Sequence, residues 1–215
     1  MKKSIMQHNI FIFLSCGIII TLFLLWCILN AISTNKNKID QYVETYKMGE
    51  TVDLGTNFFA DAKENPVGYS IKVNSARLIE FKPFVESLGG DFETFGFTKG
   101  YPAPKYTYLL DVTIKNSGNA DGAIMAINYA LYNKALKIPV DFSLWGLMDK
   151  NFTGEPGFRV WPDTEVDITI PFTPMASDTG INNSEIERRM ESEDFYFCVS
   201  EFPVRKLIHI ECPNM

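Results

Sequence analysis

Apolar and polar residues alternate with a period of two along several short segments of the chain. Tyr69, Ile71 and Val73 follow this alternation, and Leu78 rejoins it after a shift near residues 74–75. A strand with one face on a core produces this pattern, because its successive side chains point to opposite sides. The same alternation predicts strands within residues 68–81, 108–115, 125–131, 166–173, 195–202 and 207–212.

Turn-forming residues separate these segments. Gly, Pro, Asn and Asp cluster between them, and a short alternating segment at residues 48–59 predicts a further, edge-like strand. Only residues 183–191, which begin with an asparagine cap, have a helical pattern. Parallel strands would need crossover helices between them. The sequence therefore predicts an all-β fold, an antiparallel β-sandwich.

The N-terminal region has a different pattern. Residues 10–29 form a run of 20 residues without a charge, and at about 1.5 Å per residue such a helix spans the hydrocarbon core of a bilayer. The run is longer than the apolar part of a typical cleaved signal. We expect residues 1–9 to be a cytoplasmic tail, 10–32 a transmembrane signal-anchor helix, 33–47 a stalk and 48–215 an extracytoplasmic domain. Cleavage near Ser33, which would release the domain, is the alternative.

The charge balance narrows the range of partners. The chain has 20 Lys and Arg against 26 Asp and Glu, a net charge of -6. Nucleic-acid binding needs a basic surface that replaces counterions on the phosphate backbone. We therefore expect no nucleic-acid partner, and instead the membrane and a protein of the cell envelope.

Residues suited to catalysis are few. The chain has two histidines: His8 precedes the apolar run, and His209 lies in the last predicted strand. They cannot meet across the expected membrane segment, and the sequence places no second base beside His209. We therefore expect no enzyme activity, no catalytic residue and no cofactor.

One segment has a partial resemblance to a calcium-binding loop. Asn119, Asp121 and Gly122 have suitable spacing, but Ser117 and Asn128 stand where the first Asp and the twelfth Glu of such a loop belong. A hairpin turn that uses Asn and Gly for positive φ explains the segment without an ion. We expect no metal site.

Two long predicted loops, residues 82–105 and 149–162, are rich in aromatic residues. In the first loop, charged residues alternate with the rings and give the polar rim that partner surfaces have. The alternative is that the rings fold back and close the ends of the sandwich, because large exposed apolar patches are rare. The possible interaction surface consists of Phe92, Phe95, Phe97 and Tyr101.

Cys198 and Cys212 are the two cysteines that follow the apolar run. A hairpin with residues 203–206 as its turn would place Phe202 opposite Ile208, and therefore Cys198 opposite Cys212. Opposed residues in an antiparallel pair are close enough for a disulfide after a small adjustment, and an extracytoplasmic setting favours oxidation. The alternative is a pair of buried thiols that pack as small apolar groups.

Four segments carry a family resemblance: MGETVDLGTNFF (48–59), GYSIKVNSA (68–76), YLLDVTIKNSGNADG (108–122) and VWPDTEVDITIPFTP (160–174). Through them the chain resembles the uncharacterised DUF5028 domains, and it is more loosely similar to the DUF4352 group of surface proteins of Gram-positive bacteria. The resemblance implies an immunoglobulin-like β-sandwich outside the cytoplasm. It implies no catalytic or binding residues.

These features together predict a membrane-anchored extracytoplasmic binding module that recognises another cell-envelope protein or a ligand. The alternative is an accessory or structural subunit of a membrane complex such as a transporter, with the apolar helix forming part of the interface.

Overall fold

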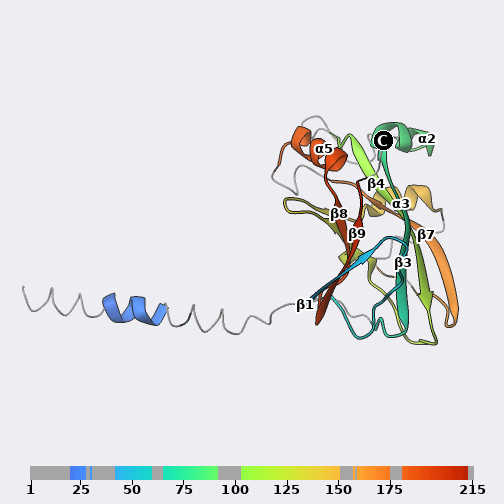
Figure 1. Cartoon of the computed structure of the whole chain (residues 1–215). Coiled ribbons are helices and arrows are strands. Elements are labelled where there is room, and N and C mark those ends of the chain that lie inside the picture. The colour runs from blue at the N-terminus through green and yellow to red at the C-terminus, as the bar shows by residue number, and fades with distance from the viewer. Residues whose placement is uncertain are drawn as a thin grey trace, which may run out of the picture. The chain divides into compact units, whose positions relative to one another are not determined.

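Figure 1 shows the protein as a computed structural model, which describes residues 20–27, 30, 42–59, 65–91, 103–150, 157, 159–174 and 181–212. The chain divides into two compact units, Met1–Asp40 and Gln41–Met215. In the first unit, residues 20–27 are helical. Among the described residues, no helix is long and apolar enough to cross a membrane. Most of the transmembrane helix predicted at residues 10–32 lies outside the described residues.

The second unit contains a four-stranded antiparallel sheet with the order β2-β3-β4-β7. Its long central pair runs from Tyr69 opposite Asn116 to Glu80 opposite Tyr106, and the register shifts between Val73 and Ser75. The alternation in the sequence predicted these strands and the shift. The strands are β2 (Val52–Asp53), β3 (Tyr69–Glu80), β4 (Tyr106–Asn116) and β7 (Thr164–Phe172).

A five-stranded sheet faces the first one and has the order β1-β9-β8-β5-β6. Its strands are β1 (Tyr42–Lys47), β5 (Ala130–Tyr132), β6 (Lys137–Pro139), β8 (Phe195–Ser200) and β9 (Val204–Ile210). The prediction of strands at residues 195–202 and 207–212 is confirmed in outline, but β9 begins three residues earlier than Leu207. The two sheets make the predicted β-sandwich.

Strand β1 corrects two expectations. Residues 42–47 were expected to belong to a stalk, but they pair in parallel with β9, from Tyr42 opposite Val204 to Lys47 opposite His209. The sandwich is therefore not wholly antiparallel. The backbone groups of β1 gain ladder partners from the edge of β9, and this outweighs the polar character that suggested a spacer.

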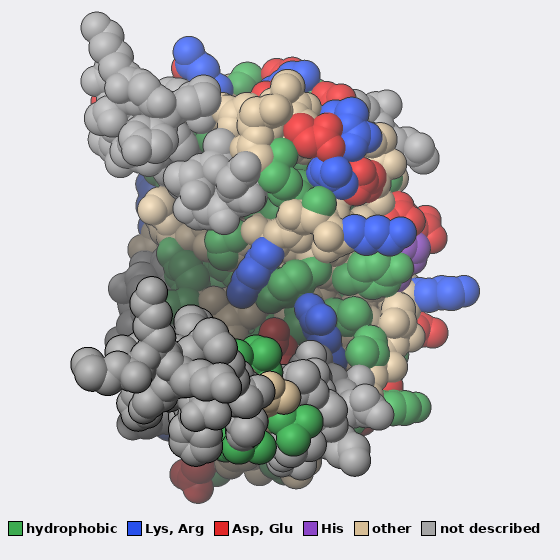
Figure 2. All heavy atoms as spheres, turned by 90° about the vertical axis from the view of Figure 1, so that its left-hand side faces the viewer, with side chains coloured by type: hydrophobic (Ala, Val, Ile, Leu, Met, Phe, Trp, Pro, Cys, Tyr) green, Lys and Arg blue, Asp and Glu red, His purple; other side chains and the backbone are tan. Residues whose placement is uncertain are grey.

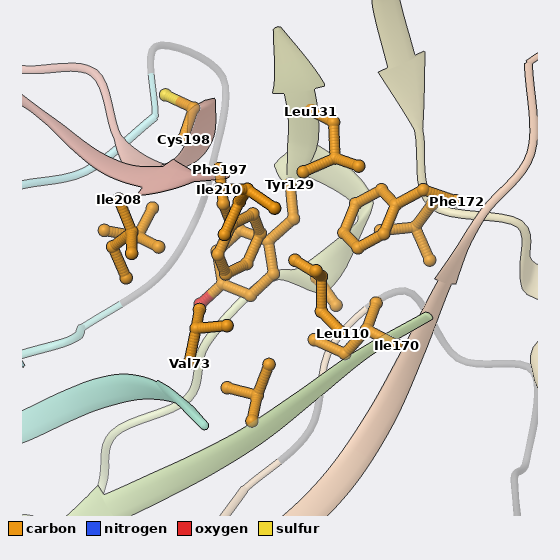
Figure 3. Close-up of a cluster of buried hydrophobic side chains, with 14 of the residues drawn as sticks. Val73, Leu110, Tyr129, Leu131, Ile170, Phe172, Phe197, Cys198, Ile208 and Ile210 are labelled. Atoms are coloured by element: carbon orange, nitrogen blue, oxygen red, sulfur yellow. The ribbon is translucent and has the colours of Figure 1, made fainter. Parts of the chain in front are cut away.

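The core lies between the sheets (Figure 3). Leu131, Phe197 and Ile208 occupy one cross-strand row of the five-stranded sheet, and Leu110 and Ile170 face them from the four-stranded sheet; all five are fully buried. Burying a side chain of this size contributes about 1.5–3 kcal/mol each. This packing fixes which residues of β5, β8 and β9 point outward.

Short helices connect the strands: α2 (Phe81–Ser87), η2 (Ala126–Asn128), α3 (Phe142–Met148) and α5 (Asn183–Ser192). Helix α5 confirms the predicted helix, although its cap is Asn182, whose side chain accepts a hydrogen bond from the Glu185 amide. Helix α2 lies where a loop was predicted, and η2 shortens the strand predicted at residues 125–131. Phe81 and Trp145, which precede the two aromatic segments, are buried.

Candidate binding face on the five-stranded sheet

The outward rows of the five-stranded sheet follow from its register. Leu131, Phe197 and Ile208 face the core, so the next cross-strand row faces outward. Tyr132 lies opposite Tyr196 across one ladder, and Tyr196 lies opposite His209 across the next. The outward row consists of Lys137, Tyr132, Tyr196 and His209.

This face carries an open hollow of about 840 Å³. Figure 2 views the domain from the side on which β8 and β9 lie in Figure 1, and it shows Lys and Arg side chains spread among hydrophobic ones. A hollow that is wide and open suits a segment of a protein better than an enclosed small molecule. Its lining consists of Tyr132, Asn133, Lys134, Arg189, Glu193, Asp194, Tyr196, Arg205 and Leu207.

Arg205 lines the hollow and contacts one of its aromatic rings. Its guanidinium carbon is 5.0 Å from the centre of the Tyr132 ring, and the ammonium group of Lys137 is 5.5 Å from the same ring. A cation over an aromatic face at this distance is attracted by the ring quadrupole. The Nε atom of Arg205 is buried and has no hydrogen-bond partner among the described residues. The Tyr132 ring therefore contacts two cations, Lys137 and Arg205. The Nε–H donor of Arg205 has no hydrogen-bond partner within the described part of the chain.

Cys198 lies beneath Arg205. It is fully buried in β8, opposite Leu207, and it points to the other side of the sheet from Phe197 (Figure 3). Burial raises the pKa of the Cys198 thiol, and the neighbouring Arg205 only partly opposes this shift. The thiol is therefore neutral at physiological pH and acts as an apolar floor.

Acidic residues at one edge of the hollow are already engaged. Arg189 binds Glu185 and Glu193 at 2.8 and 3.0 Å. Asp194 accepts a hydrogen bond of 2.9 Å from the Cys212 amide, and its other oxygen lies 2.9 Å from Nε2 of His209. These two contacts, the backbone one first, hold the pKa of Asp194 below its usual value. The carboxylates on this side are therefore already paired.

The basic residues on the other side lack such partners. Within the part of the chain that the structure describes, no carboxylate lies within 4.0 Å of the charged nitrogens of Lys134, Lys137 or Arg205. Lys137 and Arg205 thus lie over the Tyr132 ring, and Lys134 and Tyr196 line the hollow beside it. This arrangement can bind a carboxylate and stack an aromatic or apolar group beside it.

The predicted disulfide between Cys198 and Cys212 does not form, and the expected register was wrong. Cys198 lies opposite Leu207, whereas Cys212 lies five residues further along and beyond the end of β9, with its sulfur 3.1 Å from the Glu191 carbonyl oxygen. Five strand residues at about 3.3 Å each exceed the reach of a disulfide. The prediction failed because residues 204–206 continue β9 instead of forming the turn.

Other predicted site residues are placed as follows. The possible interaction surface of Phe92, Phe95, Phe97 and Tyr101 lies outside the described residues. The 116–122 segment is a turn with Gly118 at φ 80°, and the Asn119 side chain donates to the carbonyl groups of Asn65 and Val67. Among the described residues, no group of three His, Cys, Asp or Glu could hold a metal ion.

Sequence reasoning missed the hollow, with the exception of His209 and Cys198 at its margin. Tyr132 and Tyr196 are 64 positions apart, and only the β5–β8 register brings them together. A signal was present in β9, where Arg205, Leu207 and His209 alternate with Lys206 and with the core residues Ile208 and Ile210. That alternation would have marked an outward row if residues 204–206 had been interpreted as strand.

The fold and this face define the class of protein: a two-sheet β-sandwich domain with a basic and aromatic hollow on its five-stranded sheet. A family model, the Domain of unknown function (DUF5028), matches residues 43–206, so the chain belongs to this family, as its sequence motifs predicted. Comparison with curated proteins gave no match, and comparison with solved structures gave none either.

Proposed function

We propose that this protein is a membrane-anchored binding module of the cell envelope, with an immunoglobulin-like β-sandwich outside the cytoplasm. In this proposal residues 10–32 anchor the chain and the hollow recognises an acidic segment of a partner protein. The module binds and does not catalyse.

One observation carries the proposal: Arg205 and Lys137 share the Tyr132 ring, and neither has a carboxylate partner among the described residues. A Glu or Asp side chain of a partner would supply the missing counter-charge. A partially buried guanidinium strengthens such a contact, because water screens it less. Tyr196 and Leu207 would add apolar contact beside the ion pair.

The test places a photo-crosslinking amino acid in the full chain within its native cell envelope. At positions 132 and 207 we expect an adduct of one discrete mass. Position 115 is the control, since Lys115 is exposed on the opposite sheet. An adduct at position 115 equal to that at position 132, or no adduct at all, would contradict the proposal.

Charge reversal tests the chemistry of the same contact. The double variant Lys134→Glu and Lys137→Glu should reduce the adduct at least tenfold, since loss of each charged contact costs about 1.4 kcal/mol or more. The matched control, Lys72→Glu with Lys115→Glu, makes the same change in net charge on the other sheet. Loss of the adduct on exchanging residues 10–29 for a generic helix, with charge reversal having no effect, would favour an accessory subunit instead.

A further inference from the structure

The exposed large hydrophobic side chains of the β-sandwich are not scattered over it. In the described part of residues 42–212, six of the seven large hydrophobic side chains with high exposure lie near one end of the domain, and the seventh, Ile127, is in η2. The six residues are Tyr42, Val43, Phe58, Val67, Trp161 and Val166. The ring of Trp161 is the most exposed, at 82%.

The strand registers show that these residues share one end, which we call the entry end because β1 begins there. Tyr42 lies opposite Val204 at the start of β9, and Asn116 lies opposite both Tyr69 and Thr164. The two sheets are joined at this end by the β-bridge between the loop at Phe58 and the turn at residue 202. Figure 1 shows the starts of β1, β3 and β7 on this side and α5 on the other.

Trp161 is held in its exposed position by the backbone. The Trp161 carbonyl oxygen accepts hydrogen bonds from the Thr164 amide at 3.2 Å and from the Thr164 hydroxyl at 2.6 Å, which fixes the turn before β7. The neighbouring Val160 is buried and anchors the same segment to the core. The indole therefore projects from a fixed turn, and its exposure has a cost unless something covers it.

The length of chain between the apolar run and β1 limits the distance between that run and the entry end. Tyr42 follows the apolar run of residues 10–29 after 12 intervening residues. Fully extended, 12 residues span at most about 40 Å, so the entry end stays within that distance of the end of the run. This step rests on the proposed anchoring of residues 10–32.

We infer that the entry end is a lipid-contacting rim, in which Trp161, Tyr42 and Phe58 enter the headgroup region of the bilayer that holds the anchor. Trp and Tyr favour this region because each combines an apolar ring with a polar tip. The exposed charges at the same end are mixed: Asp121, Asp163 and Glu165 lie there together with Lys115 and Arg159, so this end has no excess of positive charge to attract anionic lipids. The rim therefore binds neutral phospholipid through apolar contact.

This contact has a consequence for the hollow. Tyr132 and Tyr196 lie toward the α5 end of the five-stranded sheet, where β8 begins and β5 ends. A domain that rests on the bilayer by its entry end presents the hollow away from the lipid. The rim would thus orient the binding face toward a partner.

The experiment uses the full chain in nanodiscs of phosphatidylcholine with brominated acyl chains, which quench tryptophan at the membrane. The chain has three tryptophans: Trp26 in the apolar run, Trp145 and Trp161. The difference in emission between the wild-type chain and the Trp161→Phe variant isolates Trp161. We expect brominated lipid to quench this difference signal at least twofold. The emission that remains in the variant comes from Trp26 and from Trp145, which is buried in the domain, so quenching of this emission by the brominated lipid reports Trp26, and hence the anchor.

A control variant combines Trp161→Phe with Lys82→Trp, which places a tryptophan on α2 at the other end of the domain, where the Lys82 side chain is 63% exposed. Its added emission should not be quenched. If Trp26 is quenched and Trp161 is not, the proposed lipid contact of the entry end is wrong, while the proposed anchoring by residues 10–32 is supported. If neither is quenched, both are wrong. Unquenched Trp161 with crosslinked dimers of the chain would assign the rim to a second copy and overturn the lipid contact.

Discussion

The hydroxyl group of Tyr108 donates a hydrogen bond of 2.9 Å to the backbone carbonyl oxygen of Met190. This bond joins strand β4 to helix α5, and the Tyr108 ring also packs against Phe195, with ring centres 5.4 Å apart. Burial raises the pKa of Tyr108 well above its usual value, so the hydroxyl remains a donor at any physiological pH. One side chain of the four-stranded sheet thereby positions the helix that borders the hollow.

Substitution Tyr108→Phe tests this connection. The variant keeps the ring but leaves the Met190 carbonyl without this donor, so we expect the free energy of unfolding to fall by about 1–3 kcal/mol. Urea denaturation followed by circular dichroism measures the loss. Tyr42→Phe, on a ring that is 65% exposed, is the matched control and should change little. Equal stability of the Tyr108 variant and the control would contradict the role of this bond.

Substitutions at two glycines with positive φ can distinguish the cost of backbone strain from the cost of a steric clash. Gly68 has φ 82°, and a Cβ there would lie 2.8 Å from the Ser117 carbonyl oxygen, whereas Gly89 has φ 75° and open space around it. Gly89→Ala should cost about 1 kcal/mol through strain alone. Gly68→Ala should cost at least about 1 kcal/mol more, since the Ser117 backbone must also move. Thermal melts of the two variants compare the costs; a smaller loss for Gly68→Ala would be the contrary result.

Helix α5 should lose stability in acid. The pKa of Glu185 falls from 4.5 to about 2, first because Arg188 donates hydrogen bonds to it and further because Arg188 and Arg189 are positively charged. A depressed folded-state pKa stabilises the fold above pH 4.5, and this contribution is lost as the pH falls from 4.5 toward 2. Melting temperatures between pH 6 and pH 2 should fall less for Glu185→Gln than for the wild type. Glu187→Gln is the control in the same helix, and a pH profile for Glu185→Gln identical to the wild type would refute the assignment.

The two cysteines of the domain should differ in reactivity but not be joined. Burial raises the pKa of both thiols, and Cys198 is fully enclosed. We expect iodoacetamide to modify Cys212 slowly and Cys198 hardly at all in the native protein, because the thiolate is the reactive form. In denaturant without a reducing agent, both should be alkylated. If mass spectrometry finds both cysteines unmodified under those conditions, the disulfide between Cys198 and Cys212 forms after all.

The sequence predicted the central strands because their alternation is local. The side chains of Tyr69, Ile71 and Val73 in β3 face the core of the domain, and the predicted register shift lies at residues 74–75. In the same way, Val166–Phe172 alternates clearly enough to mark β7. In each case the residues of the buried face lie within one short stretch of the sequence, so their alternation can be recognised without knowledge of distant residues.

The elements that the sequence did not predict depend on distant partners. Strand β1 has no consistent apolar face, since Tyr42 and Tyr46 alternate with Val43 on the other side, and its partner β9 begins 162 residues after Tyr42. The register of β8 and β9 also shifts between Cys198 and Ser200. Residues 195–199 are all apolar, so no break in an alternation marks this second shift, and the pairing of the cysteines and the position of the hollow remained hidden.

The parallel pairing of β1 with β9 determines how the domain carries mechanical load. All six residues of β1 are paired, from Tyr42 opposite Val204 to Lys47 opposite His209. A partner held at Tyr132 and Tyr196 lies toward the end of the sheet where β1 finishes, so a pull between that partner and the chain before Tyr42 runs along the strand axis. Because ladder hydrogen bonds lie across the strands, such a pull shears them together instead of peeling them one at a time. If residues 10–32 anchor the chain and the hollow binds a partner, as proposed above, the pairing of β1 with β9 resists a pull between the two.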